Sequence, residues 1–256
     1  MDQICADLAA EHAALDAIVA DLDVVGWTAA TPAAGWDIAD TIVHLIQADV
    51  AARVAADEPD RYVELRGVAA TQGLDVFGAR DGRTGAEILT WWRHERELML
   101  AAFRARGPKD RLPWFGPDMS TKSFATARLM ETWSHGRDVA DTVGKPWPST
   151  DRLRHVAHIG ISTRGWSYLN RGLTPPETPV RVELDAPSGE QWSWGPTDAA
   201  DVVRGQAEDF CLVVTQRRRP EETDLVTIGS AAEEWIGIAQ AFAGRPTEAP
   251  EARVSA

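Results

Sequence analysis

The stretch FATARLMETWSHGRDVAD, residues 124–141, decides the fold and places the chemistry. Phe124, Glu131, His135 and Val139 recur in it at multiples of three to four residues, so they share one face of a helix. A carboxylate and an imidazole therefore interrupt an apolar stripe. An ionised carboxylate is expensive to bury without a salt bridge, a proton or a metal ion. The four-residue spacing allows Glu131 and His135 to reach one ion from the same helix.

A second helix is predicted over residues 38–57, with Asp37 as its N-cap. His44 lies within its apolar run 42–46, so we expect this imidazole to be buried. Two imidazoles and one carboxylate from two facing helices are typical of a catalytic divalent-metal site with open coordination positions. The donor set favours zinc, and nickel, cobalt or iron also fit.

A structural interpretation of the same residues stays open at this point. A lone histidine in an apolar helix is often a packed core residue, which would account for His44 without a metal. Glu131 could form a salt bridge with Arg128 or with a residue on the first helix. Spacing alone does not decide between the metal site and these alternatives.

The N-terminal region, residues 1–148, is predicted to be a four-helix bundle, a fold whose core often holds metal or ligand sites. The predicted helices cover residues 3–23, 38–57, 84–103 and 122–143. Between the second and third, residues 57–83 have no clean period and contain several turn formers, which predicts a long connection, helical at most in part. Ser120 and Thr121 can cap the fourth helix.

The C-terminal region, residues 149–246, is predicted to be a small α+β domain that follows the linker GKPWPSTD. A helix over 151–168 is expected to bridge the domains. Beyond Pro175 the apolar period changes from helical to two, which is typical of strands. The predicted strands cover 179–186, 190–196, 200–205 and 223–229, and the predicted helices cover 207–218 and 230–244. The tail 247–256 is predicted to be disordered.

Composition narrows the classes of partner. The net charge of -13 over 256 residues is unsuited to nucleic acid, because a phosphate backbone needs a dense cationic surface. No run approaches the roughly 20 apolar residues of a membrane-spanning helix. The first residues also lack the basic segment followed by an apolar segment that is typical of a signal peptide. A cytoplasmic protein with a small-molecule substrate is expected, whereas the oligomeric state is left open. The two cysteines, far apart in sequence, do not support a disulfide framework.

The segments WDIADTIVHL, residues 36–45, and ETWSHGRDVAD, residues 131–141, resemble the metal-binding signature of the DinB-like superfamily. Within it, the chain resembles the mycothiol-dependent maleylpyruvate isomerase family, and in particular an actinobacterial subgroup described only as metal-binding proteins. The resemblance implies that His44, Glu131 and His135 hold zinc or a similar ion. It also implies a DinB-like bundle followed by a sterol-carrier-like α+β domain. In such an isomerase the ion activates a low-molecular-weight thiol, which adds to an unsaturated acid. For this chain the resemblance implies mycothiol as the co-substrate.

Further residues are candidates for catalysis. The resemblance implies a second-domain arginine that assists the reaction, and the cluster Arg217, Arg218 and Arg219 occupies a comparable place. A basic helix C-terminus that complements the helix dipole explains this cluster equally well. His158, on the predicted bridging helix, could act as a general acid or base, although a surface or interface role also fits.

Two residues of the bundle could assist the metal site. His12 lies on the apolar stripe of the first helix and could be an additional ligand or a packed histidine. Asp138 could orient His135, or could be an exposed partner of a neighbouring arginine. The favoured prediction is a metal-dependent isomerase, thiol transferase or lyase that acts on a small organic electrophile. The alternative is a non-catalytic metal-containing protein that binds a small molecule in an apolar pocket.

Overall fold

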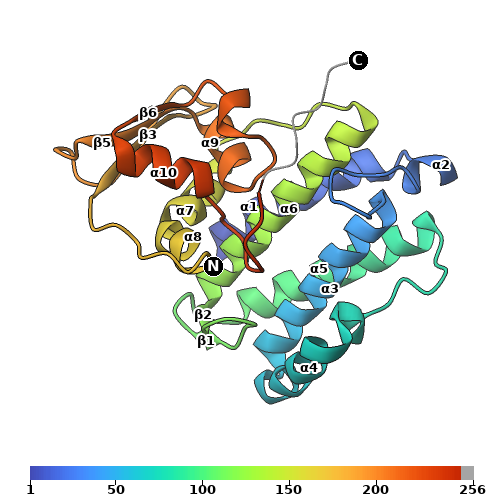
Figure 1. Ribbon diagram of the computed structural model, residues 1–256. Helices are drawn as coiled ribbons and strands as arrows, with labels where there is room; N and C mark the ends of the chain where they lie inside the picture. Colours follow the sequence, from blue (N-terminus) through green and yellow to red (C-terminus); the bar gives the residue numbers. More distant parts are fainter. Residues whose placement is uncertain (249–256) are drawn as a thin grey trace. The chain divides into compact units, whose positions relative to one another are not determined.

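The computed structural model describes residues 1–248 and divides into two compact units, the first Met1–Trp147 and the second from Pro148 onward (Figure 1). Most of the tail that was predicted to be disordered, residues 249–256, lies outside the described residues. None of the helices in the described part is long and apolar enough to cross a membrane. The arrangement of a helical unit followed by a mixed α+β unit confirms the predicted fold class.

Four long helices build the first unit, as predicted. They are α1 (Asp2–Val19), α3 (Ile38–Asp57), α5 (Gly85–Arg104) and α6 (Thr121–Val143). Helix α3 packs chiefly against α5, and α6 packs chiefly against α1. The bundle is therefore two helix pairs, which meet along an α3–α6 seam and an α1–α5 seam.

The helix starts follow from local side-chain chemistry. Asp37 caps α3 and forms a reciprocal capping box with Asp40, and Thr84 does the same with Glu87 at the start of α5. Ser120 caps α6 by accepting a hydrogen bond from the backbone N–H of Ser123. These boundaries were readable from the sequence because each cap depends on residues three positions apart.

The connection predicted over residues 57–83 is more ordered than expected. It contains helix α4 (Pro59–Gln72) and the 3-10 helix η1 (Leu74–Phe77). Helix α4 buries only Tyr62 and Ala69, so it has no apolar stripe for a periodicity search to detect. The short helix α2 (Val24–Trp27) and the two-stranded β1 (Arg111–Leu112) and β2 (Met119–Ser120) were also not predicted.

The second unit contains a four-stranded mixed sheet in the order β4-β3-β5-β6. Its strands are β3 (Val180–Asp185), β4 (Gln191–Trp194), β5 (Asp201–Gln206) and β6 (Val226–Ile228). Strand β3 pairs antiparallel with β4, as the predicted hairpin requires, and parallel with β5. Strand β6 pairs antiparallel with β5 and forms the other edge.

The helices of the second unit are shorter than predicted. They are α7 (Leu153–Ser162), α8 (Arg164–Leu169), α9 (Ala207–Val214), the 3-10 helix η2 (Pro220–Glu222) and α10 (Ser230–Ile238). The helix predicted over 151–168 is interrupted at Thr163, whose backbone leaves the helical region. Helix α9 ends before Gln216, which has a positive φ of 60°. Thr163 and Gln216 have no strong preference for turns, so their residue types do not predict that the helices end there.

His12 on α1 is buried, and neither of its ring nitrogens has a hydrogen-bond partner among the described residues. Burial, followed by the positive charges of Arg96 and Arg128, holds the pKa of His12 well below its usual value of 6.5. The unfolded chain therefore binds a proton at His12 that the folded chain does not. The resulting loss of stability begins as the pH falls through the unfolded-state value and grows below it.

His12→Leu is expected to reduce this acid sensitivity, because leucine fills a similar volume without a titratable group. Urea unfolding at two pH values, one above 7 and one unit below the ordinary imidazole pKa, measures the effect. The wild type should lose about 1.4 kcal/mol more than the variant between them. An equal pH dependence in both proteins would show that His12 is accessible to protons in the folded state.

Candidate metal centre

The three residues predicted as metal ligands come together in the first unit. His44 extends from the second turn of α3, while Glu131 and His135 lie one turn apart on α6. Each residue offers one ligand atom, and the three atoms all lie within 4.8 Å of one another. Among the described residues, this is the group of histidine, cysteine and carboxylate side chains that could hold a metal ion.

The distances suit a shared ion better than direct hydrogen bonds. Nε2 of His44 lies 3.8 Å from Oε2 of Glu131, and Nε2 of His135 lies 3.5 Å from the same oxygen. Two ligand atoms bound at about 2.1 Å to one tetrahedral ion would be roughly 3.4 Å apart. Both imidazoles therefore present a nitrogen to the carboxylate at a separation close to that of two ligands on one cation. The donor set and its spacing fit zinc or a similar divalent ion.

Electrostatics favour the protonation states that bind a metal. Burial opposes ionisation of Glu131, but His135 and His44 outweigh it and hold its pKa well below the usual value. Burial also lowers the pKa of His44, although Glu131 acts in the opposite direction. A low carboxyl pKa and a low imidazole pKa together leave an anionic oxygen and a neutral nitrogen near neutral pH, which are the forms that coordinate a cation.

The centre keeps an accessible side. The side chains of His44 and Glu131 remain 22% and 24% exposed, whereas that of His135 is 10% exposed. His44 was expected to be buried, and this residual exposure corrects that expectation. Three protein ligands with one accessible side are typical of catalytic metal sites, since a structural zinc is normally closed by four protein groups.

Asp138 lies behind His135 rather than at the surface. Its Oδ2 is 3.2 Å from Nδ1 of His135, and the residue is 4% exposed. The carboxylate thus faces one ring nitrogen while the other ring nitrogen faces Glu131. Such a carboxylate fixes the tautomer and the orientation of a ligating imidazole.

Trp36 is a neighbour of the centre that the sequence analysis overlooked. Its ring centroid lies 4.9 Å from that of His44 and 5.9 Å from that of His135, with the second pair nearly parallel. Arg80 supports this corner, because it binds the carboxylates of Asp37 and Asp40 at the start of α3. Trp36 could have been predicted near the centre from the sequence, because it immediately precedes the N-cap Asp37 and therefore lies close to the first turns of α3.

The salt bridge considered between Glu131 and Arg128 is not formed. Arg128 instead binds Asp49 of α3, so this structural alternative for Glu131 was wrong. His12 does not belong to the ligand group. Trp133 and Trp192 are buried core residues, and Trp114 stacks on Tyr62.

The predicted catalytic residues Arg217, Arg218 and His158 all belong to the second unit. Arg217 and Arg218 follow α9, where the guanidinium of Arg217 donates to the carbonyl of Thr215 and that of Arg218 donates to the carbonyl of Arg217. His158 is exposed on α7. Their roles in catalysis stay predictions.

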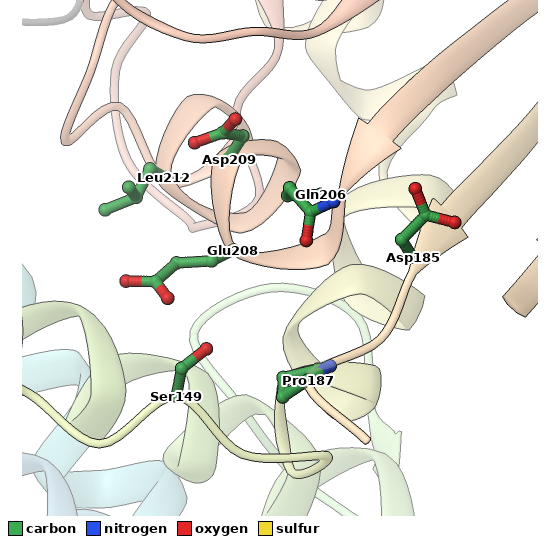
Figure 2. Close-up of a pocket in the computed structure, with 7 residues that line it drawn as sticks. All are labelled: Ser149, Asp185, Pro187, Gln206, Glu208, Asp209 and Leu212. Carbon is green, nitrogen blue, oxygen red and sulfur yellow. The ribbon is translucent and has the colours of Figure 1, made fainter. Parts of the chain in front are cut away.

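The second unit has a cavity of its own, with a volume of about 210 Å³, where β3 and β5 end and α9 begins (Figure 2). It is lined by Ser149, Asp185, Pro187, Gln206, Glu208, Asp209 and Leu212. Figure 2 shows the carboxylates of Asp185, Glu208 and Asp209 around it. Three carboxylates lie in this lining beside the apolar side chains of Pro187 and Leu212, so the cavity is mixed in character and not the purely apolar pocket of the binding-protein alternative.

Fold and centre together define a two-unit protein with a three-ligand metal-type site in its helical bundle. The family model of the mycothiol maleylpyruvate isomerase N-terminal domain matches residues 8–140, more than half of the chain. The chain belongs to this family, which confirms the predicted resemblance. A second model, described as wyosine base formation, matches residues 176–227.

Relatives and solved structures agree with this assignment. Uncharacterized proteins from two strains of Mycobacterium tuberculosis are each 47% identical over 245 residues, covering 94% of this chain and 95% of the relative. The crystal structure of the mycothiol-dependent maleylpyruvate isomerase is similar with a TM-score of 0.57 at 13% identity, and that of its histidine-to-alanine mutant with 0.58 at 12%. Each comparison covers 96% of both chains, and at these identities it shows the shared fold alone.

Asp138→Asn is expected to weaken metal binding by about tenfold or more, because the amide holds the His135 ring less firmly and in either tautomer. Isothermal titration with zinc measures the dissociation constant. Asp141→Asn is the matched control, since Asp141 lies one turn further along α6 and contacts Arg137 instead of a ligand. Equal affinities for the Asp138 variant and the control would remove Asp138 from the centre.

Bound metal is expected to be retained from pH 8 down to the ordinary imidazole pKa of 6.5 and to be released below it. The lowered pKa of His44 places its protonation, and hence its competition with the metal, under that value. The depressed pKa of Glu131 keeps the carboxylate ionised throughout this range. Metal content after dialysis at a series of pH values gives the profile, and release already above pH 7 would contradict it.

Proposed function

We propose that this protein is a metal-dependent enzyme of the isomerase, thiol transferase or lyase type, acting on a small organic electrophile or unsaturated acid. The observation that carries the proposal is the convergence of His44, Glu131 and His135 at ligand spacing, with one side of the group accessible. A centre built only to stabilise the bundle would be expected to be closed by a fourth protein ligand.

Zinc is the proposed ion, because two imidazoles and a carboxylate are typical of catalytic zinc sites. Nickel, cobalt and iron remain compatible with the same donors. When bound, the ion would supply a Lewis acid that lowers the pKa of a coordinated thiol or water, or polarises a substrate carbonyl.

The chain's own residues have defined tasks in this scheme. His44, Glu131 and His135 hold the ion, and Asp138 keeps Nε2 of His135 directed toward it. The exposed edges of His44 and Glu131 leave an approach for a thiol and an electrophile from one side. The indole of Trp36 stacks on the ring of His135 and lies at a tilt against that of His44, so it supports both imidazoles from one side.

Mycothiol is the proposed co-substrate, on the ground that the family and the structurally similar enzyme are named for it. A carboxylate on the substrate would need a cationic partner, and Arg217 and Arg218 are the proposed ones. His158 is proposed to transfer a proton. A small-molecule substrate is proposed in preference to a nucleic acid because of the net charge of -13.

The proposal is tested in two stages, with metal analysis first. Purified wild type should contain about one divalent ion per chain, whereas His44→Ala and Glu131→Ala should contain none after dialysis. Glu64→Ala serves as the control, because this glutamate lies on the exposed surface of α4, where it pairs with Arg61. Metal that persists in both ligand variants would place the site elsewhere.

The second stage measures conversion of the electrophile, together with thiol consumption, because an isomerase returns the thiol after each turnover whereas a transferase consumes it. Wild type is incubated with mycothiol and either maleylpyruvate or a chloronitrobenzene electrophile, with glutathione and cysteine as comparison thiols. We expect turnover that chelator treatment abolishes and added zinc restores, and that both ligand variants lack. A metal-loaded protein that converts neither electrophile with any of the thiols would favour the alternative of a non-catalytic metal-containing protein.

A further inference from the structure

A buried ion pair lies next to the metal centre, on the same two helices. The guanidinium of Arg128 on α6 lies 3.0 Å from the carboxylate of Asp49 on α3. It also donates to the backbone carbonyl of Leu45, at 3.3 Å. The two side chains are 3% and 0% exposed, so water does not screen the pair.

Stability alone does not explain such a pair. Removing two charges from water is expensive, and well-packed apolar residues in place of a buried pair are often neutral or stabilising. Burial raises the pKa of Asp49 even though Arg128 opposes the shift. A carboxyl whose pKa is higher in the folded chain than in the unfolded chain costs folding free energy when it is ionised at neutral pH.

The position of the pair suggests another role. The metal ligands come from α3 and α6, but each of these helices packs chiefly against a different partner, α5 and α1 respectively. Apolar packing within the two helix pairs therefore does not by itself define the register across the α3–α6 seam. Arg128 crosses that seam three residues before Glu131, and it binds α3 at the carbonyl of Leu45, the residue after His44.

We propose that the Arg128–Asp49 pair is a positioning element of the metal centre, which fixes α6 against α3 so that Glu131 and His135 meet His44 at ligand spacing. This inference rests on the metal-dependent function proposed above. The guanidinium fork is suited to the task because its donors hold two acceptors in fixed directions, whereas apolar contacts allow sliding.

The test replaces both charges by apolar groups of similar length, in the variant Arg128→Met with Asp49→Leu. The net charge of the chain is unchanged, so a general electrostatic effect on cation binding is avoided. The variant should unfold in urea, without metal, at a concentration equal to or higher than the wild type does. Its dissociation constant for Co²⁺, measured by visible absorption, should rise by about tenfold or more, and the ligand-field bands should shift because the ligand geometry changes.

The other seam provides a matched control. Asp16 on α1 accepts hydrogen bonds from Arg93 on α5 through both carboxylate oxygens, and this pair crosses the α1–α5 seam, which carries no metal ligand. The variant Asp16→Leu with Arg93→Met also conserves net charge. Its Co²⁺ spectrum and affinity should stay within about twofold of the wild type, whatever its effect on the urea midpoint.

Each outcome decides the question. An unchanged Co²⁺ affinity and spectrum in the Arg128–Asp49 variant overturns the positioning role, and so does an equal loss in both seam variants. If the apolar variant does not fold, Arg128→Lys replaces it, because lysine keeps the charge but cannot hold both acceptors; unchanged binding then overturns the role as well. Failure of the wild type itself to bind Co²⁺, with His44→Ala indistinguishable from it, would instead reject the proposed metal-dependent function.

Discussion

A half-buried carboxylate that faces two imidazoles is the constraint around which the first unit is arranged. Oε2 of Glu131 lies within 4 Å of a nitrogen from each histidine, and the two rings keep its pKa low although burial opposes the charge. A carboxylate oxygen beside two imidazole nitrogens forms a donor set suited to a divalent cation. The capped start of α3, the tryptophan beside it and the carboxylate behind His135 all serve to keep these three groups in place.

The bundle places this group at a seam between two helix pairs, which has both a benefit and a cost. A seam can leave one side of the ligands accessible, as the exposure of His44 and Glu131 shows. It also makes the ligand geometry depend on the register between helices that are not each other's main packing partners. Directional polar contacts solve this problem better than apolar contacts do, because a hydrogen bond has a preferred direction as well as a distance.

Family membership and fold similarity support different conclusions about this protein. The family is shared over more than half of the chain, and the fold is shared with an isomerase of known structure at 12–13% identity. A fold can host several chemistries, so the reaction has to be argued from the site. The site offers three ligands and an accessible side, which is compatible with thiol activation, hydration or carbonyl polarisation by one ion. Chemical assays with defined thiols separate these reactions.

The sequence by itself determined the four bundle helices, the caps of α3 and α6, and the Glu131–His135 pair, because all of these depend on residues three or four positions apart. His44 could be added because it interrupts an apolar helix and matches a family motif. The sequence also determined the strand pattern of the second unit, because the spacing of apolar residues changes from helical to alternating after Pro175.

Only the tertiary structure decided which groups meet from distant parts of the chain. It paired Arg128 with Asp49 instead of Glu131. It turned Asp138 toward His135, although the sequence allowed this side chain to face solvent equally well. It also placed Trp36 against both histidines. The structure also revealed helix α4, which is largely exposed and therefore has no periodic pattern of apolar residues in its sequence. The physical reason is common to these cases: local propensity depends on near neighbours in sequence, whereas the partner of a buried polar group depends on how separate helices pack.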